Sequence, residues 1–189
     1  AEELKRDAAA GIFHDDQYVF SAMNGMGHFE KLAQYFPKDH IYCGTAMIAT
    51  RLDGPANVDF MGAEGTEVMH IAKYDQQADD ETFQAVFADL NQAMLNPVVV
   101  DEWLGMCMSK VVFNAVTNTL CTMFEMQIGQ FIEYDGVREM SKQLFDEAYD
   151  ACERAGIYLI ATRQEQVDSV ITVSQEYKYH YPSMYQDFS

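Results

Sequence analysis

The sequence of 189 residues is 49% hydrophobic, which is enough for a buried core in one domain or two small ones and is unlike a disordered chain. Its 12 Lys and Arg residues stand against 30 Asp and Glu residues, and the net charge of -18 disfavours nucleic-acid binding, because phosphate neutralisation needs positive charge. The sequence has no signal-peptide pattern and no run of 18 apolar residues, so neither secretion nor membrane spanning is indicated and we expect a cytoplasmic protein.

The 4 cysteines lie in apolar surroundings, without a Cys-x-x-Cys pair and without a Cys/His cluster at metal-ligand spacing. They are Cys43, Cys107, Cys121 and Cys152. This pattern predicts reduced thiols in an intracellular protein and no metal site.

The chain begins with the order helix, strand, turn, helix. Residues 2–12 read as the end of a helix with Gly11 as its stop, and residues 17–23 form a short apolar run typical of a buried strand. Asn24 to Gly27 is a polar glycine turn, and residues 28–35 read as a helix. A turn at the carboxyl end of such a strand is where ligands bind in α/β sheets.

Three β-like segments follow, at residues 41–50, 56–61 and 67–74. Because their connections are short, we expect them to pair antiparallel at the margin of the sheet. Asp79 or Asp80 can cap a helix whose apolar residues keep the helical period. Those apolar residues are Phe83, Val86, Phe87, Leu90 and Met94, and residues 98–100 then read as a brief β-like connector.

From Glu102 onward the sequence predicts helices only, so we place a domain boundary near residue 100. A long helix comes first, and a second covers about residues 137–155 with Gly156 at its C′ position. The residues expected to face inward on it are Val137, Met140, Leu144, Ala148 and Cys152. Thr162 and Glu165 fit the capping box of a third helix, whose apolar face would hold Val167, Val170 and Ile171.

The long helix carries an unusual polar face. Lys110, Asn114 and Asn118 are spaced at i, i+4 and i+8, which places one amine and two carboxamides on the same side. Asn is a poor choice for an ordinary solvated helix face. The face could bind substrate, with the ammonium as proton donor and the carboxamides as hydrogen-bonding groups, and the spacing alone leaves a solvated face equally open.

Two further segments have alternative interpretations. The turn at Asn24 and Gly25 could lie against a cofactor at the sheet edge, or could simply be a turn. The polar, aromatic segment from Tyr181 to Asp187 could present a hydroxyl to a ligand, or could be a surface connector.

Four sequence motifs, in this order, resemble the ketopantoate reductase family of NADPH-dependent 2-oxoacid reductases. They are NGMGH at residues 24–28, GTAMIATRLDGP from Gly44, SKVVFNAVTNTL at residues 109–120 and SMYQD at residues 183–187. Two sequence segments resemble the branch of the family that includes D-mandelate-type 2-hydroxyacid dehydrogenases. They are YPSMYQD near the end of the chain and NTLCT around the second Asn of the helix.

The resemblance implies an α/β plus all-α fold. Residues 1–100 would be the C-terminal part of a Rossmann-like domain, and residues 101–189 the first helices of an all-α, 6-phosphogluconate-dehydrogenase-like C-terminal domain, with the active site in the cleft between them. The family's GxGxxG loop would precede Ala1, and a family glutamate would follow Ser189. On this interpretation the chain is an internal fragment that does not turn over by itself.

The resemblance also implies a role for each matching residue. Lys110 would be the general acid, while Asn114, Asn118 and Ser183 would bind the substrate. Gln127 lies nearest to a position where the family has another substrate-binding asparagine. Asn24 and Thr50 would contact the coenzyme, although an upstream insertion affects the match at Thr50. Where many members have a Trp two residues before the lysine, this chain has Met108.

The function implied is hydride transfer between NADPH and a small-molecule 2-oxo acid, giving a D-2-hydroxy acid. Reduction of 2-dehydropantoate to pantoate, a step of pantothenate biosynthesis, is the first reaction to test, and a homodimer is implied as well. The alternative within the enzyme class is a mandelate-type D-2-hydroxyacid dehydrogenase using NAD(H). The alternative from another class is a non-catalytic dinucleotide-sensing or dimerisation module.

Overall fold

The computed structural model describes residues 2–48, 50–60 and 69–188, and the chain divides into two compact units, Ala1–Cys107 and Met108–Ser189. The division falls inside the long helix, because the first turns of that helix pack with the sheet of the first unit.

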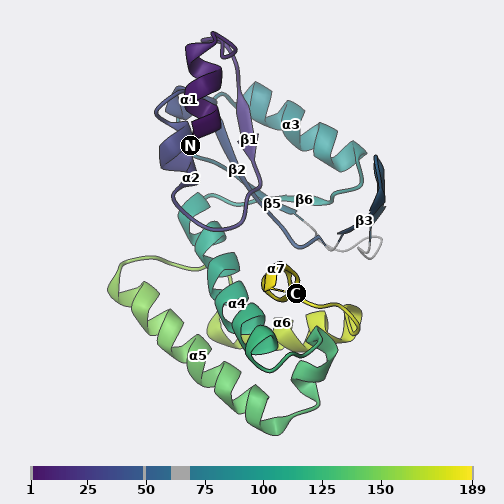
Figure 1. Cartoon of the computed structure of the whole chain (residues 1–189). Coiled ribbons are helices and arrows are strands. Elements are labelled where there is room, and N and C mark those ends of the chain that lie inside the picture. The colour runs from purple at the N-terminus through teal and green to yellow at the C-terminus, as the bar shows by residue number, and fades with distance from the viewer. Residues whose placement is uncertain (1, 49, 61–68, 189) are drawn as a thin grey trace. The chain divides into compact units, whose positions relative to one another are not determined.

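Figure 1 shows the elements along the chain. The first unit contains α1 (Glu2–Ala9), β1 (Val19–Ser21), α2 (His28–Leu32), η1 (Lys38–His40), β2 (Ile41–Ala46), β3 (Thr50–Gly54), β4 (Asn57–Phe60), β5 (Met69–Lys73), α3 (Asp80–Gln92) and β6 (Pro97–Val99). The long helix α4 (Trp103–Met123) follows, and then η2 (Ile128–Ile132), α5 (Asp135–Arg154), α6 (Arg163–Glu176) and α7 (Ser183–Phe188).

The main sheet of the first unit has the order β1-β2-β5-β6. β1 pairs parallel with β2, β2 antiparallel with β5, and β5 parallel with β6. The prediction that three successive segments pair at the sheet margin is therefore wrong in part: β2 lies inside the sheet, and among the described residues β3 pairs with β4 in a separate hairpin. The reason is that β2 is buried on both faces, which favours an interior strand. Residues 49, 61 and 67–68 of the predicted strands lie outside the described part.

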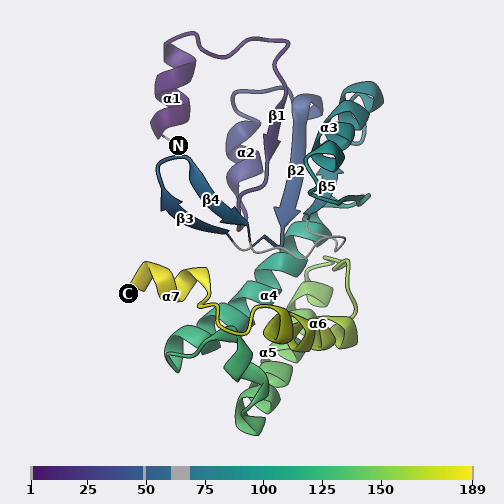
Figure 2. The ribbon, with the colours of Figure 1, turned by 90° about the vertical axis from the view of Figure 1, so that its right-hand side faces the viewer.

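Helices cover both faces of this sheet, as Figure 2 shows for α2 and α3. Ile41 and Cys43 of β2 pack with Phe29 of α2, whereas Tyr42, which points to the other face, packs with Phe83 of α3. The alternation follows from the two-residue period of a strand. Met106 and Cys107, on α4, join the first of these clusters.

The start of α3 confirms one predicted cap, and its end corrects a predicted core residue. The Asp79 carboxylate accepts hydrogen bonds from the backbone N–H groups of Glu81 and Thr82. Met94 is 74% exposed, because the helix ends at Gln92 and Met94 has left the apolar stripe. The expected connector at residues 98–100 overlaps β6, which becomes a strand of the sheet.

The secondary-structure elements described in the second unit are all helices, joined by loops, as predicted. The inward stripe of α5 differs from the expected one and consists of Val137, Ser141, Phe145, Tyr149 and Cys152. Met140 is 41% exposed, because the two large aromatic rings set the rotation of the helix. On α6, Val170 is buried but Ile171 is exposed.

Local sequence signals fix the helix ends of this unit. The capping box of Thr162 and Glu165 is present at the start of α6. At the end of α5, Gly156 has φ 70°, and Ile157 N–H donates to Cys152 O at 2.9 Å, which is the Schellman arrangement. Both features were expected from the sequence.

Candidate functional site

The site begins with the polar face of α4. Lys110, Asn114 and Asn118 are all partly buried, and they lie beside the fully packed side of the helix that holds Val112 and Phe113. Burial lowers the pKa of the Lys110 ammonium from 10.5 to about 8. An ordinary solvated lysine would keep its usual pKa, so this face is not a simple solvated one.

A lysine with a pKa near 8 suits proton transfer at physiological pH. Its protonated form can donate to a developing oxyanion, and two carboxamides on the same face offer both donors and acceptors to carboxylate and hydroxyl groups. In a chain of net charge -18, Lys110 also supplies positive charge where an anion would bind.

The end of α4 leads directly to Gln127. Met126 N–H donates to Cys121 O at 2.8 Å, which closes α4 just beyond Asn118 and places Gln127 at the start of η2. Gln127 is partly buried, and its backbone N–H donates to the Gln130 side chain at 3.0 Å. These hydrogen bonds therefore fix the backbone of Gln127 relative to the end of α4.

The start of η2 is also hydrogen-bonded to the segment that precedes Ser183. Ile128 N–H donates to His180 O at 2.9 Å, and Gly129 N–H to Lys178 O at 3.0 Å. Glycine is required at 129, because a Cβ there would lie 2.5 Å from the Lys178 backbone oxygen. Ser183 itself is the first residue of α7 and is exposed, next to the stacked rings of Tyr181 and Tyr185 at 4.3 Å. The second unit thus connects the segments that hold Lys110, Gln127 and Ser183.

Asn24 and Thr50 lie in the first unit. Asn24 is exposed in the turn after β1, and Thr50 opens β3, which follows β2. Since β1 and β2 are parallel neighbours, both residues follow strand ends at the same edge of the sheet. The side chain of Thr50 lies outside the described part of the structure.

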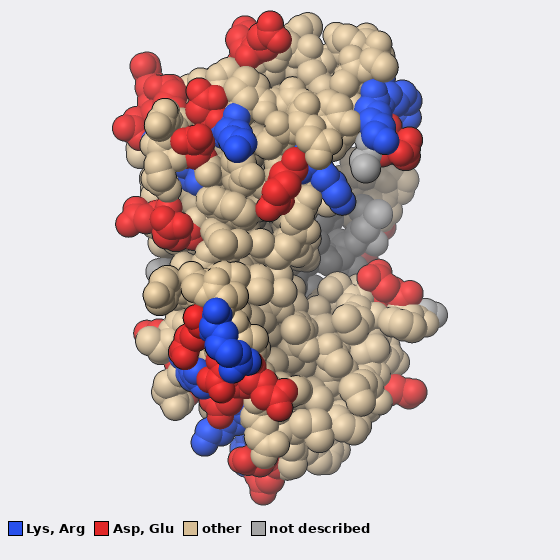
Figure 3. Space-filling view, turned by 90° about the vertical axis from the view of Figure 1, so that its left-hand side faces the viewer, with Lys and Arg blue, Asp and Glu red and all other residues tan. Residues whose placement is uncertain are grey.

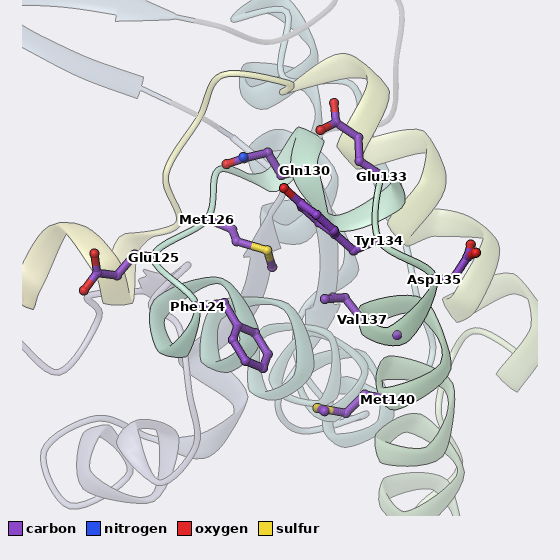
Figure 4. Close-up of a pocket in the computed structure, with 10 residues that line it drawn as sticks. Phe124, Glu125, Met126, Gln130, Glu133, Tyr134, Asp135, Val137 and Met140 are labelled. Carbon is purple, nitrogen blue, oxygen red and sulfur yellow. The ribbon is translucent and has the colours of Figure 1, made fainter.

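A surface pocket at the far end of α4 from Lys110 does not suit an anionic substrate. Its volume is about 690 Å³, and apolar side chains such as Phe124, Met126 and Met140 line it. Figure 4 shows the carboxylates of Glu125 and Glu133 directed away from its centre. No Lys or Arg and none of the predicted site residues is among those that line it, so we do not place the site there.

The described residues contain no group of three His, Cys, Asp or Glu side chains that could hold a metal ion. All four cysteines are free and buried. Burial raises the pKa of Cys107 to about 11 and that of Cys121 to about 12, so both remain protonated thiols. Burial therefore disfavours the thiolate, the nucleophilic form, at Cys107 and Cys121.

Figure 3 shows Asp and Glu side chains spread over the visible face, with Lys and Arg side chains in several places among them. Several basic side chains of the described residues form ion pairs with acidic neighbours; Arg163, for example, lies 3.4 Å from Asp146 and 3.1 Å from Glu153. Within the described ranges, no helix is long and apolar enough to cross a membrane.

Ser109, which precedes Lys110 and is 6% exposed, is not among the predicted site residues. Its hydroxyl accepts a hydrogen bond from the backbone of Ile160, 51 residues away in sequence. The only local signal was a serine inside an otherwise apolar helical stretch, where serine is a mediocre helix former.

The fold and this site define a protein of the α/β plus all-α class, with a sheet unit followed by a helical unit. A sequence model described as ketopantoate reductase PanE/ApbA matches residues 2–74, and its C-terminal counterpart matches residues 102–189. Together the two matches cover most of the chain, and the chain belongs to the ketopantoate reductase family.

Individual relatives agree with this assignment. The chain is 27% identical over 179 residues to a 2-dehydropantoate 2-reductase of Streptococcus pyogenes serotype M3, covering 94% of this chain and 56% of that protein. The chain therefore spans about half the length of the curated relatives it matches.

Solved structures share the fold. D-mandelate dehydrogenase in complex with NADH has a TM-score of 0.82 at 21% identity, covering 98% of this chain and 60% of that one. A dimeric ketopantoate reductase from Staphylococcus aureus has a TM-score of 0.69 at 20% identity, covering 99% and 60%. The predicted family and fold class are confirmed.

Proposed function

We propose that the full-length protein reduces a 2-oxo acid to a D-2-hydroxy acid, with NADPH as the hydride donor and 2-dehydropantoate as the first substrate to test. The observation that carries the proposal is the partly buried Lys110, with its pKa of about 8, on the same face of α4 as Asn114 and Asn118. The names of the curated relatives support the reaction class.

In this reaction Lys110 acts as the general acid. The coenzyme, when bound, supplies a hydride to the carbonyl carbon. The Lys110 ammonium donates its proton to the carbonyl oxygen, so the product is a neutral hydroxyl group and Lys110 is left as the amine. Reduction should therefore slow as the pH rises above about 8, and oxidation of the hydroxy acid, which needs the neutral amine, should quicken.

The other predicted residues bind and orient the substrate. Asn114 and Asn118 donate to the substrate's oxygen atoms, Ser183 donates to its carboxylate, and Gln127 contacts its distal group. The first unit would bind the coenzyme through Asn24 and Thr50.

The turn at Asn24 fits a ligand that passes over the edge of the sheet. Gly25 and Gly27 have φ of 91° and 82°, and a Cβ at either position would meet no atom within 4 Å. The backbone of the turn therefore borders open space, beside the exposed side chain of Asn24. Such a turn leaves room for the nicotinamide end of a dinucleotide to bind against its backbone.

Replacement of Lys110 by Ala in the full-length protein tests the assignment. We expect kcat for 2-oxo acid reduction to fall about 1,000-fold, because the proton donor is lost, with less than about a twofold change in the Kd for NADPH. Lys142→Ala is the matched control, since Lys142 lies exposed on α5. Near-normal turnover by Lys110→Ala would refute the role.

An NADH-dependent, mandelate-type dehydrogenase is the second candidate within the class. The motifs YPSMYQD and NTLCT favour it, and the likeness to D-mandelate dehydrogenase supports the shared fold. Initial rates with 2-dehydropantoate and with benzoylformate, each with NADPH and NADH, separate the two. A 10-fold preference for benzoylformate and NADH would replace the first proposal.

A non-catalytic dinucleotide-sensing or dimerisation module is the alternative from another class. A partly buried lysine beside two asparagines would have no use in such a module, which counts against it. Coenzyme binding without turnover of any 2-oxo acid tested would favour it. We also propose a homodimer in the cytoplasm, by analogy with the dimeric Staphylococcus aureus relative, and sedimentation velocity tests the dimer.

A further inference from the structure

Ser109 joins α4 to two other parts of the second unit. Its hydroxyl oxygen accepts a hydrogen bond from Ile160 N–H at 2.9 Å, and its backbone oxygen accepts one from Gln166 Nε2 at 3.3 Å. Ser109 and Gln166 are each only 6% exposed. Ile160 is 51 residues from Ser109 in sequence, so this bond connects α4 to a distant segment of the chain.

Both partners of Ser109 are themselves held in place. Ile160 lies in the loop between α5 and α6, where the Tyr149 hydroxyl donates to Ala161 O at 2.7 Å. Gln166 follows the capping box of Thr162 and Glu165 in the first turn of α6. The bonds to Ser109 therefore connect α4 to fixed points and not to flexible ones.

We propose that Ser109 is a positioning residue for Lys110, with Gln166 as its partner, because together they fix the turn of α4 from which Lys110 projects. The side chains of consecutive helix residues point about 100° apart around the helix axis. The hydrogen bonds of Ser109 therefore set the direction in which Lys110 points, although Ser109 itself does not contact the substrate. This inference rests on the proposed function of Lys110.

The consequence for Lys110 concerns its protonation as well as its position. The low pKa of Lys110 is due to burial, and burial depends on how firmly this turn is held. If the turn loosens, Lys110 becomes more hydrated and its pKa moves back toward 10.5. Loss of Ser109 should then affect the pH dependence of the reaction as well as its rate.

The test uses Ser109→Ala in the full-length protein, with steady-state kinetics between pH 6 and 10. We expect kcat for 2-oxo acid reduction to fall about 10-fold at pH 7, and the alkaline limb of kcat to move up by about half a pH unit or more. Ser109→Thr keeps the hydroxyl and should restore both properties. Gln166→Met, which removes the amide donor, should change both in the same direction by a smaller amount.

Ser141→Ala is the matched control. Ser141 is also buried, at 4% exposure, but its hydroxyl donates within its own helix, to Arg138 O at 2.7 Å. The kcat of Ser141→Ala and the alkaline limb of its pH dependence should match those of the parent protein.

The inference is overturned if folded Ser109→Ala keeps the kcat of the parent protein and the alkaline limb of its pH dependence. It is also overturned if Ser141→Ala shows the same changes as Ser109→Ala. If Ser109→Ala does not fold, Gln166→Met decides by the same criteria. Normal turnover by Lys110→Ala would instead refute the proposed function. An inactive Lys110→Ala together with a normal Ser109→Ala would refute the positioning role alone.

Discussion

At the scale of single residues, Lys110 shows the conflict between stability and function. A buried ammonium is less well solvated than in the unfolded chain, and this is what lowers its pKa to about 8. Below pH 8 the Lys110 amine is protonated in both the folded and the unfolded chain. The folded state then bears the full free-energy cost of burying the charged ammonium. Between pH 8 and 10.5 the unfolded state binds more protons, and stability should rise with pH.

Replacement of Lys110 by Met therefore should stabilise the fold at pH 7. After allowance for solvent screening at a partly buried site, we expect a gain on the order of 1 to 2 kcal/mol in the free energy of unfolding. The gain should shrink as the pH rises toward 10.5, where the parent no longer holds a charge at this position. Urea denaturation of both proteins at pH 7 and pH 9.5 measures it, and a difference that is equal at the two pH values would contradict the explanation.

At the scale of elements, the ends of α4 and α5 use the same turn with different residues. Glu125 occupies the C′ position of α4 with φ 53°, and Gly156 occupies that of α5 with φ 70°. Glutamate is poorly suited to this position, because its Cβ is crowded at positive φ and its negative charge meets the negative end of the helix dipole.

Two opposite substitutions test this contrast. Glu125→Gly should raise the free energy of unfolding by about 0.5 to 1 kcal/mol, whereas Gly156→Ala should lower it by about 1 kcal/mol. Chemical denaturation of both variants beside the parent protein measures the two shifts. A loss of stability in Glu125→Gly would show that the carboxylate makes a favourable contact that outweighs the backbone strain.

At the scale of the whole molecule, the net charge of -18 is the dominant electrostatic property. Repulsion among the carboxylates destabilises the compact state, and salt screens it with a Debye length that falls to about 8 Å at 0.15 M. The Tm should therefore rise by a few degrees between 10 and 150 mM NaCl. Thermal unfolding followed by circular dichroism measures the change, with KCl as a control that should act equally, and a falling Tm would show that attractive ion pairs dominate instead.

The local features of this protein follow from short stretches of its sequence. The Asp79 cap, the capping box at Thr162 and the glycine at 156 were predictable, because each depends on hydrogen bonds and backbone angles within a few residues. The spacing of Lys110, Asn114 and Asn118 likewise identified a common helix face, since helical geometry alone decides it.

Features that depend on contacts between distant parts of the chain came from the folded structure alone. It placed β2 inside the sheet, turned the Phe145 and Tyr149 side of α5 inward, and showed that Ser109 bonds to Ile160. It also decided that Lys110 is partly buried, which the spacing had left open. The physical reason is that burial and strand order are set by the packing of segments far apart in sequence, which no local pattern records.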